Sequence, residues 1–332
     1  MLSKIFLILF LLNSINSMYD LFPQVPKEYT IAPWYNFKSG AITYSFDDGS
    51  PNQLKVGVPL LDKYGLKGSF NLIVKGWGPD WEGYKKAAEN GHEVASHTYT
   101  HVSLVGLSKE QELKEIKDSK EYIENKIGQE CITLVYPYGT PGNYSIMSQY
   151  YISGRVIGSK YISSNPDDMF ALNSFCIGNV TSITTADKLN EMADKALELE
   201  KWIVFLIHGV DDDGGYSPIE STVLDAHLNY VKNNDEFWVA TFKDISKYVL
   251  EANSLIIEEN TNGKNKNLDV KCSYETSITK MDFPVTIARS LEGLCDAPKV
   301  IGENNEDVES RIDNEKVIFN VIPGKKYLIK CD

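Results

Sequence analysis

Three side chains in this 332-residue sequence have the types and spacing expected of a metal-dependent hydrolytic centre. Asp48, His97 and His101 offer one carboxylate and two imidazoles, and the two histidines lie four residues apart, close enough to point inward together. This ligand set suits Zn²⁺ with one coordination position left open for water, and it also suits Co²⁺ or Fe²⁺. We therefore predict a divalent metal site, with Zn²⁺ as the first expectation.

Asp47 and His208 could supply the proton transfers of such a centre. A bound metal lowers the pKa of water from about 15.7 to about 7, which makes hydrolysis of an amide or ester accessible at neutral pH. We expect Asp47 to act as the general base and His208 as the general acid toward the leaving group. The simpler interpretations are an acidic turn at residues 47–50 and a buried core histidine at residue 208.

The elements that must position these residues alternate between short apolar strands and helices from about residue 40 to residue 250. Repeated β–α units imply parallel strands with crossover helices, and seven or eight units fit a closed barrel better than an open sheet. We therefore predict an α/β fold, a distorted (β/α) barrel over residues 38–252. The five side chains named above follow or end predicted strands, so they should meet at the carboxyl-terminal rim of the barrel.

The two ends of the chain differ from this pattern. Residues 1–17 combine a basic residue, a short apolar run and small polar residues, which is typical of a cleaved signal peptide and predicts a secreted, extracellular protein. Residues 255–332 predict a small β-rich domain. Within it, residues 260–267 are interpreted as a polar linker or turn, and the runs 317–321 and 327–330 as a hairpin.

The charge and hydropathy of the chain exclude some partners. A formal net charge of −13 argues against nucleic acid, because an acidic surface repels phosphate backbones. After the N-terminal segment, no stretch is long and apolar enough to predict a stable membrane span. A carbohydrate polymer or oligomer is compatible with this charge.

Four short motifs resemble, in their order, those of the polysaccharide deacetylases, the NodB-homology domain of carbohydrate esterase family four. They are Phe46-Asp-Asp-Gly49, Ser96-His-Thr-Tyr-Thr-His101, Tyr136-Pro-Tyr-Gly139 and Leu206-Ile-His208. The similarity covers roughly residues 38–250. It implies a distorted (β/α) barrel that removes acetyl groups from a carbohydrate, with the base, the acid and the metal ligands at the positions already identified.

The resemblance adds one role and shows two departures. It implies that the backbone N–H of Tyr138 helps to stabilise the tetrahedral oxyanion. Many members carry arginine two positions before the proline of the third motif, where this chain has Val135, and Arg155 is a candidate substitute. The acidic segment of the fourth family motif has no clear counterpart here, and Asp167-Asp168 is the nearest one. In the family these groups orient and tune the base and the acid.

Aromatic residues in the predicted rim loops are candidate contacts for sugar rings. Trp77, Tyr99 and Tyr138 are the ones we expect to bind substrate, with ordinary loop packing as the alternative for each. The predicted function is metal-dependent removal of acetyl groups from an N-acetylglucosamine polymer such as chitin, or from O-acetylated xylan. Two alternatives stay open: a catalytically impaired carbohydrate-binding protein that keeps the barrel, and iron-dependent oxygenation with the same ligands.

Overall fold

The computed structural model describes residues 25–76 and 78–331, which divide into two compact units. Within these residues, the larger unit comprises 32–249 and 276–280, and the smaller unit comprises 25–31, 250–275 and 281–331. The predicted signal peptide at 1–17 and the predicted substrate contact Trp77 lie outside the described residues. Within the described part of the chain, no helix is long and apolar enough to cross a membrane.

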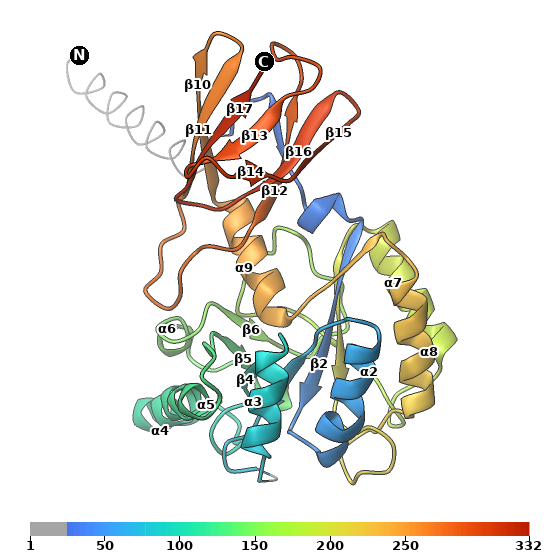
Figure 1. Ribbon diagram of the computed structural model, residues 1–332. Coiled ribbons are helices and arrows are strands. Elements are labelled where there is room, and N and C mark those ends of the chain that lie inside the picture. The colour runs from blue at the N-terminus through green and yellow to red at the C-terminus, as the bar shows by residue number, and fades with distance from the viewer. Residues whose placement is uncertain (1–24, 77, 332) are drawn as a thin grey trace, which may run out of the picture. The chain divides into compact units, whose positions relative to one another are not determined.

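A parallel sheet of eight strands forms the centre of the larger unit (Figure 1). Seven strands follow the order β6-β5-β4-β3-β2-β8-β7, and β9 pairs with the first residues of β2. Their bounds are β2 Gly40–Asp47, β3 Ser69–Leu72, β4 Glu93–Ser96, β5 Thr133–Val135, β6 Ser153–Arg155, β7 Phe175–Cys176, β8 Trp202–Ile207 and β9 Phe237–Val239.

The two ends of this sheet curl toward each other. The backbone N–H of Val156, directly after β6, donates to the carbonyl of Leu172, before β7, at 2.8 Å, and the N–H of Leu172 donates to the carbonyl of Gly154 at 3.1 Å. The central strands β2 and β8 are buried along their whole length, as strands covered on both faces must be. The prediction of a distorted (β/α) barrel is confirmed.

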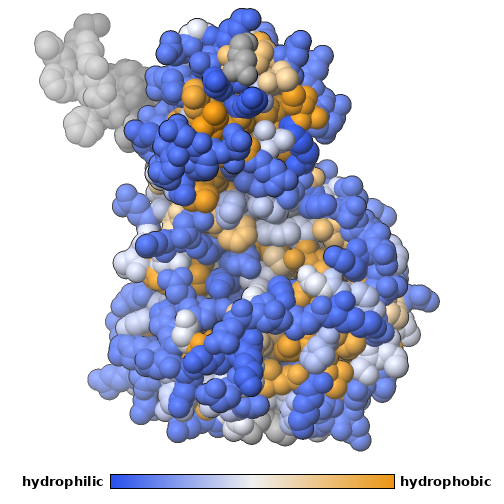
Figure 2. Space-filling view, in the orientation of Figure 1, coloured by the Kyte–Doolittle hydropathy of each residue, from blue (hydrophilic) through white to orange (hydrophobic). Residues whose placement is uncertain are grey.

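Helices cover the outside of the sheet (Figure 1). Their bounds are η1 Tyr35–Phe37, η2 Gln53–Gly57, α2 Val58–Lys63, α3 Trp81–Glu89, α4 Lys109–Leu113, η3 Lys114–Asp118, α5 Ser119–Ile127, η4 Pro137–Gly139, α6 Tyr144–Met147, α7 Ala186–Glu198, α8 Ser221–Lys232 and α9 Phe242–Asn253. The helical stretch from 109 to 127 begins with a capping box between Ser108 and Gln111 and ends at Gly128, whose φ of 78° is a left-handed C-cap. On the face shown in Figure 2, hydrophilic residues predominate and hydrophobic residues form scattered patches.

The smaller unit consists of two antiparallel sheets. One has the order β1-β12-β16-β15 and the other the order β10-β11-β17-β13-β14. Their bounds are β1 Tyr29–Ile31, β10 Leu255–Asn262, β11 Asn265–Cys272, β12 Val285–Ser290, β13 Lys299–Gly302, β14 Asp307–Val308, β15 Ser310–Asp313, β16 Lys316–Val321 and β17 Lys326–Lys330. A disulfide joins Cys295 to Cys331, and Cys131, Cys176 and Cys272 are free thiols.

The structure decides between the sequence-based interpretations of this unit. Residues 260–267 are the turn end of the β10–β11 hairpin, whose ladder runs from Leu255 to Cys272, so the turn is confirmed and the linker is wrong. The runs 317–321 and 327–330 do not form the predicted hairpin, because β16 pairs in one sheet and β17 in the other. The unit also includes β1, which precedes the barrel in sequence and pairs with β12. Alternating apolar residues mark a strand but do not specify its partner.

Candidate metal centre

The carboxyl-terminal ends of the barrel strands meet around one pocket of about 610 Å³. Asp47 ends β2, the two histidines of the HxxxH pair follow β4, and His208 follows β8. The pocket is lined by Asp47, Asp48, His97, His101, Tyr136, Tyr138, Ile157, Cys176, Val180, Thr181, His208 and Tyr216. The five chemistry-bearing residues found by motif therefore lie in a single cavity, as expected of strand ends in a parallel barrel.

Tight backbone turns direct several of these side chains into the pocket. Asp48, His101 and Tyr138 have φ angles of 74°, 63° and 59°, in the left-handed region that residues other than glycine rarely adopt. Each such residue costs about 1–3 kcal/mol, and such strain clusters at functional sites. At Asp48 the turn breaks the alternation of the strand, so that adjacent carboxylates can both reach the pocket.

Asp48, His97 and His101 form the one group of potential metal ligands identified among the described residues. The Nε2 atoms of His97 and His101 are 3.2 Å apart. The Asp48 Oδ1 atom lies 3.5 Å from the first nitrogen and 3.6 Å from the second. Ligands placed tetrahedrally around zinc at about 2.0–2.1 Å are about 3.3 Å from one another, so the three atoms fit one cation.

The hydrogen bonds of these ligands support the same interpretation. Nδ1 of His97 lies 2.8 Å from the carbonyl of Val135, which as an acceptor requires the proton on Nδ1 and leaves the Nε2 lone pair free for a metal. Oδ1 of Asp48 is buried and accepts no hydrogen bond from the described residues. Burial acts to raise the pKa of Asp48, but the nearby histidines outweigh it and hold that pKa below its usual value.

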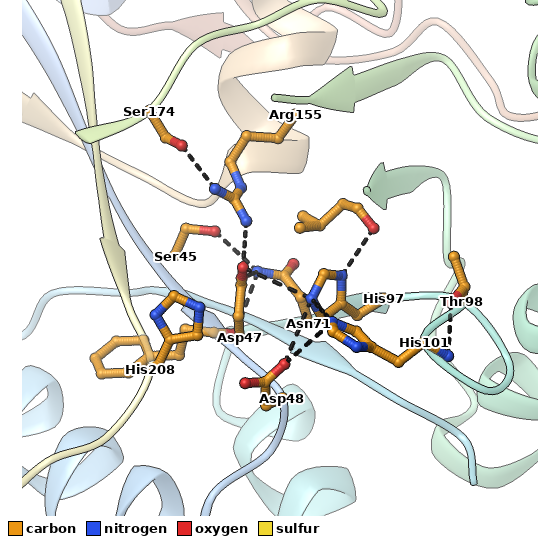
Figure 3. A network of polar contacts seen from close by, with 12 residues as sticks. Ser45, Asp47, Asp48, Asn71, His97, Thr98, His101, Arg155, Ser174 and His208 are labelled. Atoms are coloured by element: carbon orange, nitrogen blue, oxygen red, sulfur yellow. Dashed lines mark hydrogen bonds and ion pairs between the residues drawn. The ribbon is translucent and has the colours of Figure 1, made fainter. Parts of the chain in front are cut away.

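Asp47 is held from two sides in the barrel interior (Figure 3). One carboxylate oxygen accepts a hydrogen bond of 2.8 Å from Nδ2 of Asn71 on β3. The other forms an ion pair with Arg155 at the end of β6, and the same guanidinium donates to Oγ of Ser174 at 2.6 Å. This oxygen is also 3.8 Å from Nε2 of His97. Arg155, the candidate substitute for the arginine missing at position 135, thus contacts Asp47.

His208 lies on the other side of Asp47 from the histidine pair (Figure 3). Burial lowers the pKa of its imidazole, and the charges of Arg155 and His97 lower it further against the opposing carboxylates. Its Nδ1 is buried with no hydrogen-bond partner among the described residues. Asp168, the nearest candidate for an acidic partner, instead accepts a hydrogen bond from the backbone of Phe170 and lines a different cavity.

Gln53, which no sequence motif singles out, joins the strand ends at Asp47 and His208. The side chain of Gln53 is fully buried, and its Nε2 donates to the backbone carbonyls of both residues. Ser50 adds a second hydrogen bond to the His208 carbonyl at 3.1 Å and one to Asp213 at 2.8 Å. A glutamine at the start of a helical segment carries no sequence signal for this role, because the two carbonyls belong to strands that are far apart in the sequence and become neighbours only in the folded sheet.

The aromatic candidates separate into two groups. Tyr138 is 68% exposed at the mouth of the pocket, with its ring centroid 5.0 Å from that of His101. Tyr216, 57% exposed, lies over His208 at the same centroid distance. Tyr99 is half-buried, stacks edge-on against Tyr122 at 6.4 Å, and does not line this pocket. Among the residues that the structure describes, Tyr138 and Tyr216 are therefore the exposed aromatic rings that line the pocket.

The family model described as "Polysaccharide deacetylase" matches residues 35–150. This part of the barrel, about a third of the chain, is therefore similar to the polysaccharide deacetylases. The matched segment contains the base candidate, the three potential metal ligands and Tyr138, whereas Arg155 and His208 lie beyond it.

Parts of this chain also match curated relatives. A gellan lyase from a Bacillus species is 24% identical over 291 residues, which are 81% of this chain and 12% of that protein. YxkH from Bacillus subtilis (strain 168), named as a candidate polysaccharide deacetylase, is 33% identical over 102 residues, 30% of this chain and 37% of that protein. This chain thus spans about an eighth of the first relative and just over a third of the second.

A solved structure shares the barrel. A candidate polysaccharide deacetylase from Mycobacterium smegmatis superposes with a TM-score of 0.52 and 17% sequence identity. The match covers 69% of this chain and 94% of that one. At this identity the similarity concerns the fold alone, and it agrees with the barrel described above.

Proposed function

We propose that this protein is a secreted, metal-dependent hydrolase that removes acetyl groups from a carbohydrate polymer or oligomer. The observation that carries the proposal is the spacing of 3.2–3.6 Å among the ligand atoms of Asp48, His97 and His101, with Asp47 and His208 in the same pocket. The substrates that fit it are an N-acetylglucosamine polymer such as chitin and O-acetylated xylan.

Each residue of the pocket has a separate role in the proposed reaction. A divalent cation at the three ligands, with Zn²⁺ as the first candidate and Co²⁺ or Fe²⁺ as alternatives, would polarise the acetyl carbonyl and acidify the attacking water. Asp47 accepts the proton of that water, since its carboxylate is fixed by Asn71 and Arg155 and does not serve as a ligand. The backbone N–H of Tyr138 contributes a hydrogen bond to the developing oxyanion.

His208 completes the proton balance. It donates a proton to the leaving nitrogen of an amide, or to the leaving oxygen of an ester, so the products are acetate and a free amino or hydroxyl group on the sugar. Tyr138 and Tyr216 flank the mouth of the pocket and are placed to pack against the sugar ring that carries the acetyl group. Tyr99 has no such position in the described structure.

Release of acetate from defined polymers tests this proposal. The purified protein is incubated with chitin oligomers, peptidoglycan and acetylxylan, before and after treatment with a chelator, and then with Zn²⁺ or Co²⁺ restored. We expect acetate from at least one substrate, loss of activity after chelation and recovery with metal. A metal-loaded protein that releases no acetate from any member of this panel would show that the assignment is wrong.

Asp47→Asn separates catalysis from binding of metal and sugar. The substitution keeps the shape of the side chain but removes the proton acceptor, so turnover should disappear while a Co²⁺ titration still gives binding. Asp212→Asn is a matched control, because Asp212 is an exposed carboxylate outside the pocket lining. Unchanged turnover in Asp47→Asn would exclude Asp47 as the base.

A further inference from the structure

The helical stretch from 109 to 127 buries two carboxylates and exposes an apolar side chain. Glu112 and Glu115 are 4% and 8% exposed, whereas Leu113 between them is 36% exposed. A helix that packs on a core normally has the opposite arrangement, and glutamate is rarely buried without a partner. Glu115 also lies in the π-helical turn η3, and such turns are rare and often occur at functional sites. The burial of these two side chains therefore calls for specific partners.

Glu115 binds the loop that carries the two histidines of the ligand group. Its Oε2 atom accepts a hydrogen bond of 2.8 Å from the backbone N–H of Thr100, and its Oε1 atom accepts one of 2.6 Å from the Thr100 hydroxyl. Thr100 directly precedes His101 in the chain. Hydrogen bonds to a carboxylate are roughly twice as strong as those between neutral groups, so this pair fixes the loop backbone next to the second histidine.

The two histidines differ in how they depend on that backbone. The side chain of His97 is 3% exposed, and its Nδ1 lies 2.8 Å from the carbonyl of Val135, so the ring is held directly. The ring of His101 has no hydrogen-bond partner among the described residues apart from Nε2 of His97, which faces the same metal position. The backbone N–H of His101 donates to Oγ1 of Thr98 at 3.1 Å (Figure 3), and its φ of 63° persists only where surrounding contacts hold it. The position of the His101 ring is therefore set by its backbone.

We propose that Glu115 is a positioning residue for the metal centre: through Thr100 it holds His101 in the strained conformation that directs Nε2 toward the cation. The inference rests on the metal site of the proposed function. Glu115 lies outside the lining of the pocket, so it contacts neither metal nor substrate and acts through the loop. Without Glu115, Asp48 and His97 should stay in place while the third ligand loses its fixed orientation.

Calorimetric titration with Co²⁺ tests this role independently of turnover. Groups that orient a metal ligand typically contribute about 10–100-fold in metal affinity, so Glu115→Ala should raise the Co²⁺ dissociation constant by about that factor. Glu115→Gln keeps one acceptor oxygen and should give a smaller loss. Glu112→Ala is the matched control, because Glu112 is equally buried and accepts a hydrogen bond from the backbone N–H of Asn143, in a segment without a metal ligand. Its dissociation constant should stay within about threefold of the wild-type value.

The path through His101 gives a second test. Glu115→Ala added to His101→Ala should change the dissociation constant by less than about threefold, because the two substitutions remove the same interaction. Thr100→Ser keeps both hydrogen-bond donors and should bind Co²⁺ like the wild type, whereas Thr100→Val lacks the hydroxyl and should bind it more weakly. Thermal melts followed by circular dichroism establish that each variant is folded at the temperature of the titration.

Three results would overturn the proposal. They are wild-type Co²⁺ affinity in a folded Glu115→Ala variant, an equal loss of affinity in Glu112→Ala, which would indicate general loosening of the helix, and a further large loss when Glu115→Ala is added to His101→Ala. If Glu115→Ala does not fold, Glu115→Gln and Thr100→Val provide the same test. A wild-type protein that binds Co²⁺ but releases no acetate would refute the proposed function alone, whereas one that binds no Co²⁺ would refute both.

Discussion

Replacing Asp47 should destabilise the barrel before any assay of catalysis is made. Asp47→Asn leaves the guanidinium of Arg155 buried without its counter-ion, with Ser174 as its remaining hydrogen-bond acceptor. Removing one partner of a buried ion pair costs about 3–5 kcal/mol, a large share of the roughly 5–15 kcal/mol that stabilises a typical domain. For a unit of this size, about 2–4 °C is lost per kcal/mol, so the melting temperature should fall by roughly 6–20 °C.

The double variant Asp47→Asn/Arg155→Met separates this effect from catalysis. Replacing the buried cation by an apolar side chain removes the desolvation cost, so most of the lost stability should return. Acetate release should remain absent, because the proton acceptor is still missing. Thermal melts followed by circular dichroism give the stability, and a Co²⁺ titration verifies the metal site in each variant.

Two results would refute this reasoning. A single variant that melts within about 2 °C of the wild type would mean that the Arg155–Asp47 pair does not carry the energy of a buried ion pair. A double variant that hydrolyses acetylated substrate at the wild-type rate would mean that Asp47 is not the base. Recovery of stability without recovery of turnover is the outcome expected from the structure.

Three further perturbations have defined outcomes. Asp48→Asn should raise the Co²⁺ dissociation constant at least about tenfold by calorimetry, whereas the exposed Asp212→Asn should leave it unchanged. Gln53→Met removes the Gln53 donor from the carbonyls of Asp47 and His208, of which that of His208 keeps its bond from Ser50. The free energy of unfolding in urea should therefore fall by about 1–3 kcal/mol, with kcat reduced and metal affinity retained, and full wild-type stability would contradict the role of Gln53 in joining the two strands. Burial lowers the pKa of His227 to about 3 in the folded protein, against about 6.5 in the unfolded chain. The stability that the neutral, buried His227 contributes to folding is therefore complete above pH 6.5 and is lost as the pH falls toward 3. Between pH 7 and pH 5 the free energy of unfolding should fall by about 2 kcal/mol because of this residue. Urea titrations at the two pH values should show that this fall disappears in His227→Gln.

The prediction of the barrel and of its reactive pocket came from local patterns. Strand-like runs alternating with helical ones specify parallel strands, and parallel strands present their carboxyl ends at one rim. Asp47, Asp48 and His208 lie at such ends, and His97 and His101 follow another, so their convergence could be inferred without knowing which strands are neighbours. The position of Tyr99 in a rim loop did not predict its role as a substrate contact in the same way, because the direction of a loop side chain depends on the packing beneath it.

The sequence by itself determined which residue types meet at the rim, because motif and strand position are properties of short segments. The tertiary structure alone decided how the base is held: Arg155 reaches Asp47 from a strand 108 residues away, and Gln53 ties two strand ends that no local pattern connects. It also decided that β16 and β17 enter different sheets. These outcomes depend on the order and register of strands, which follow from the packing within each unit as a whole and not from the preferences of any single segment.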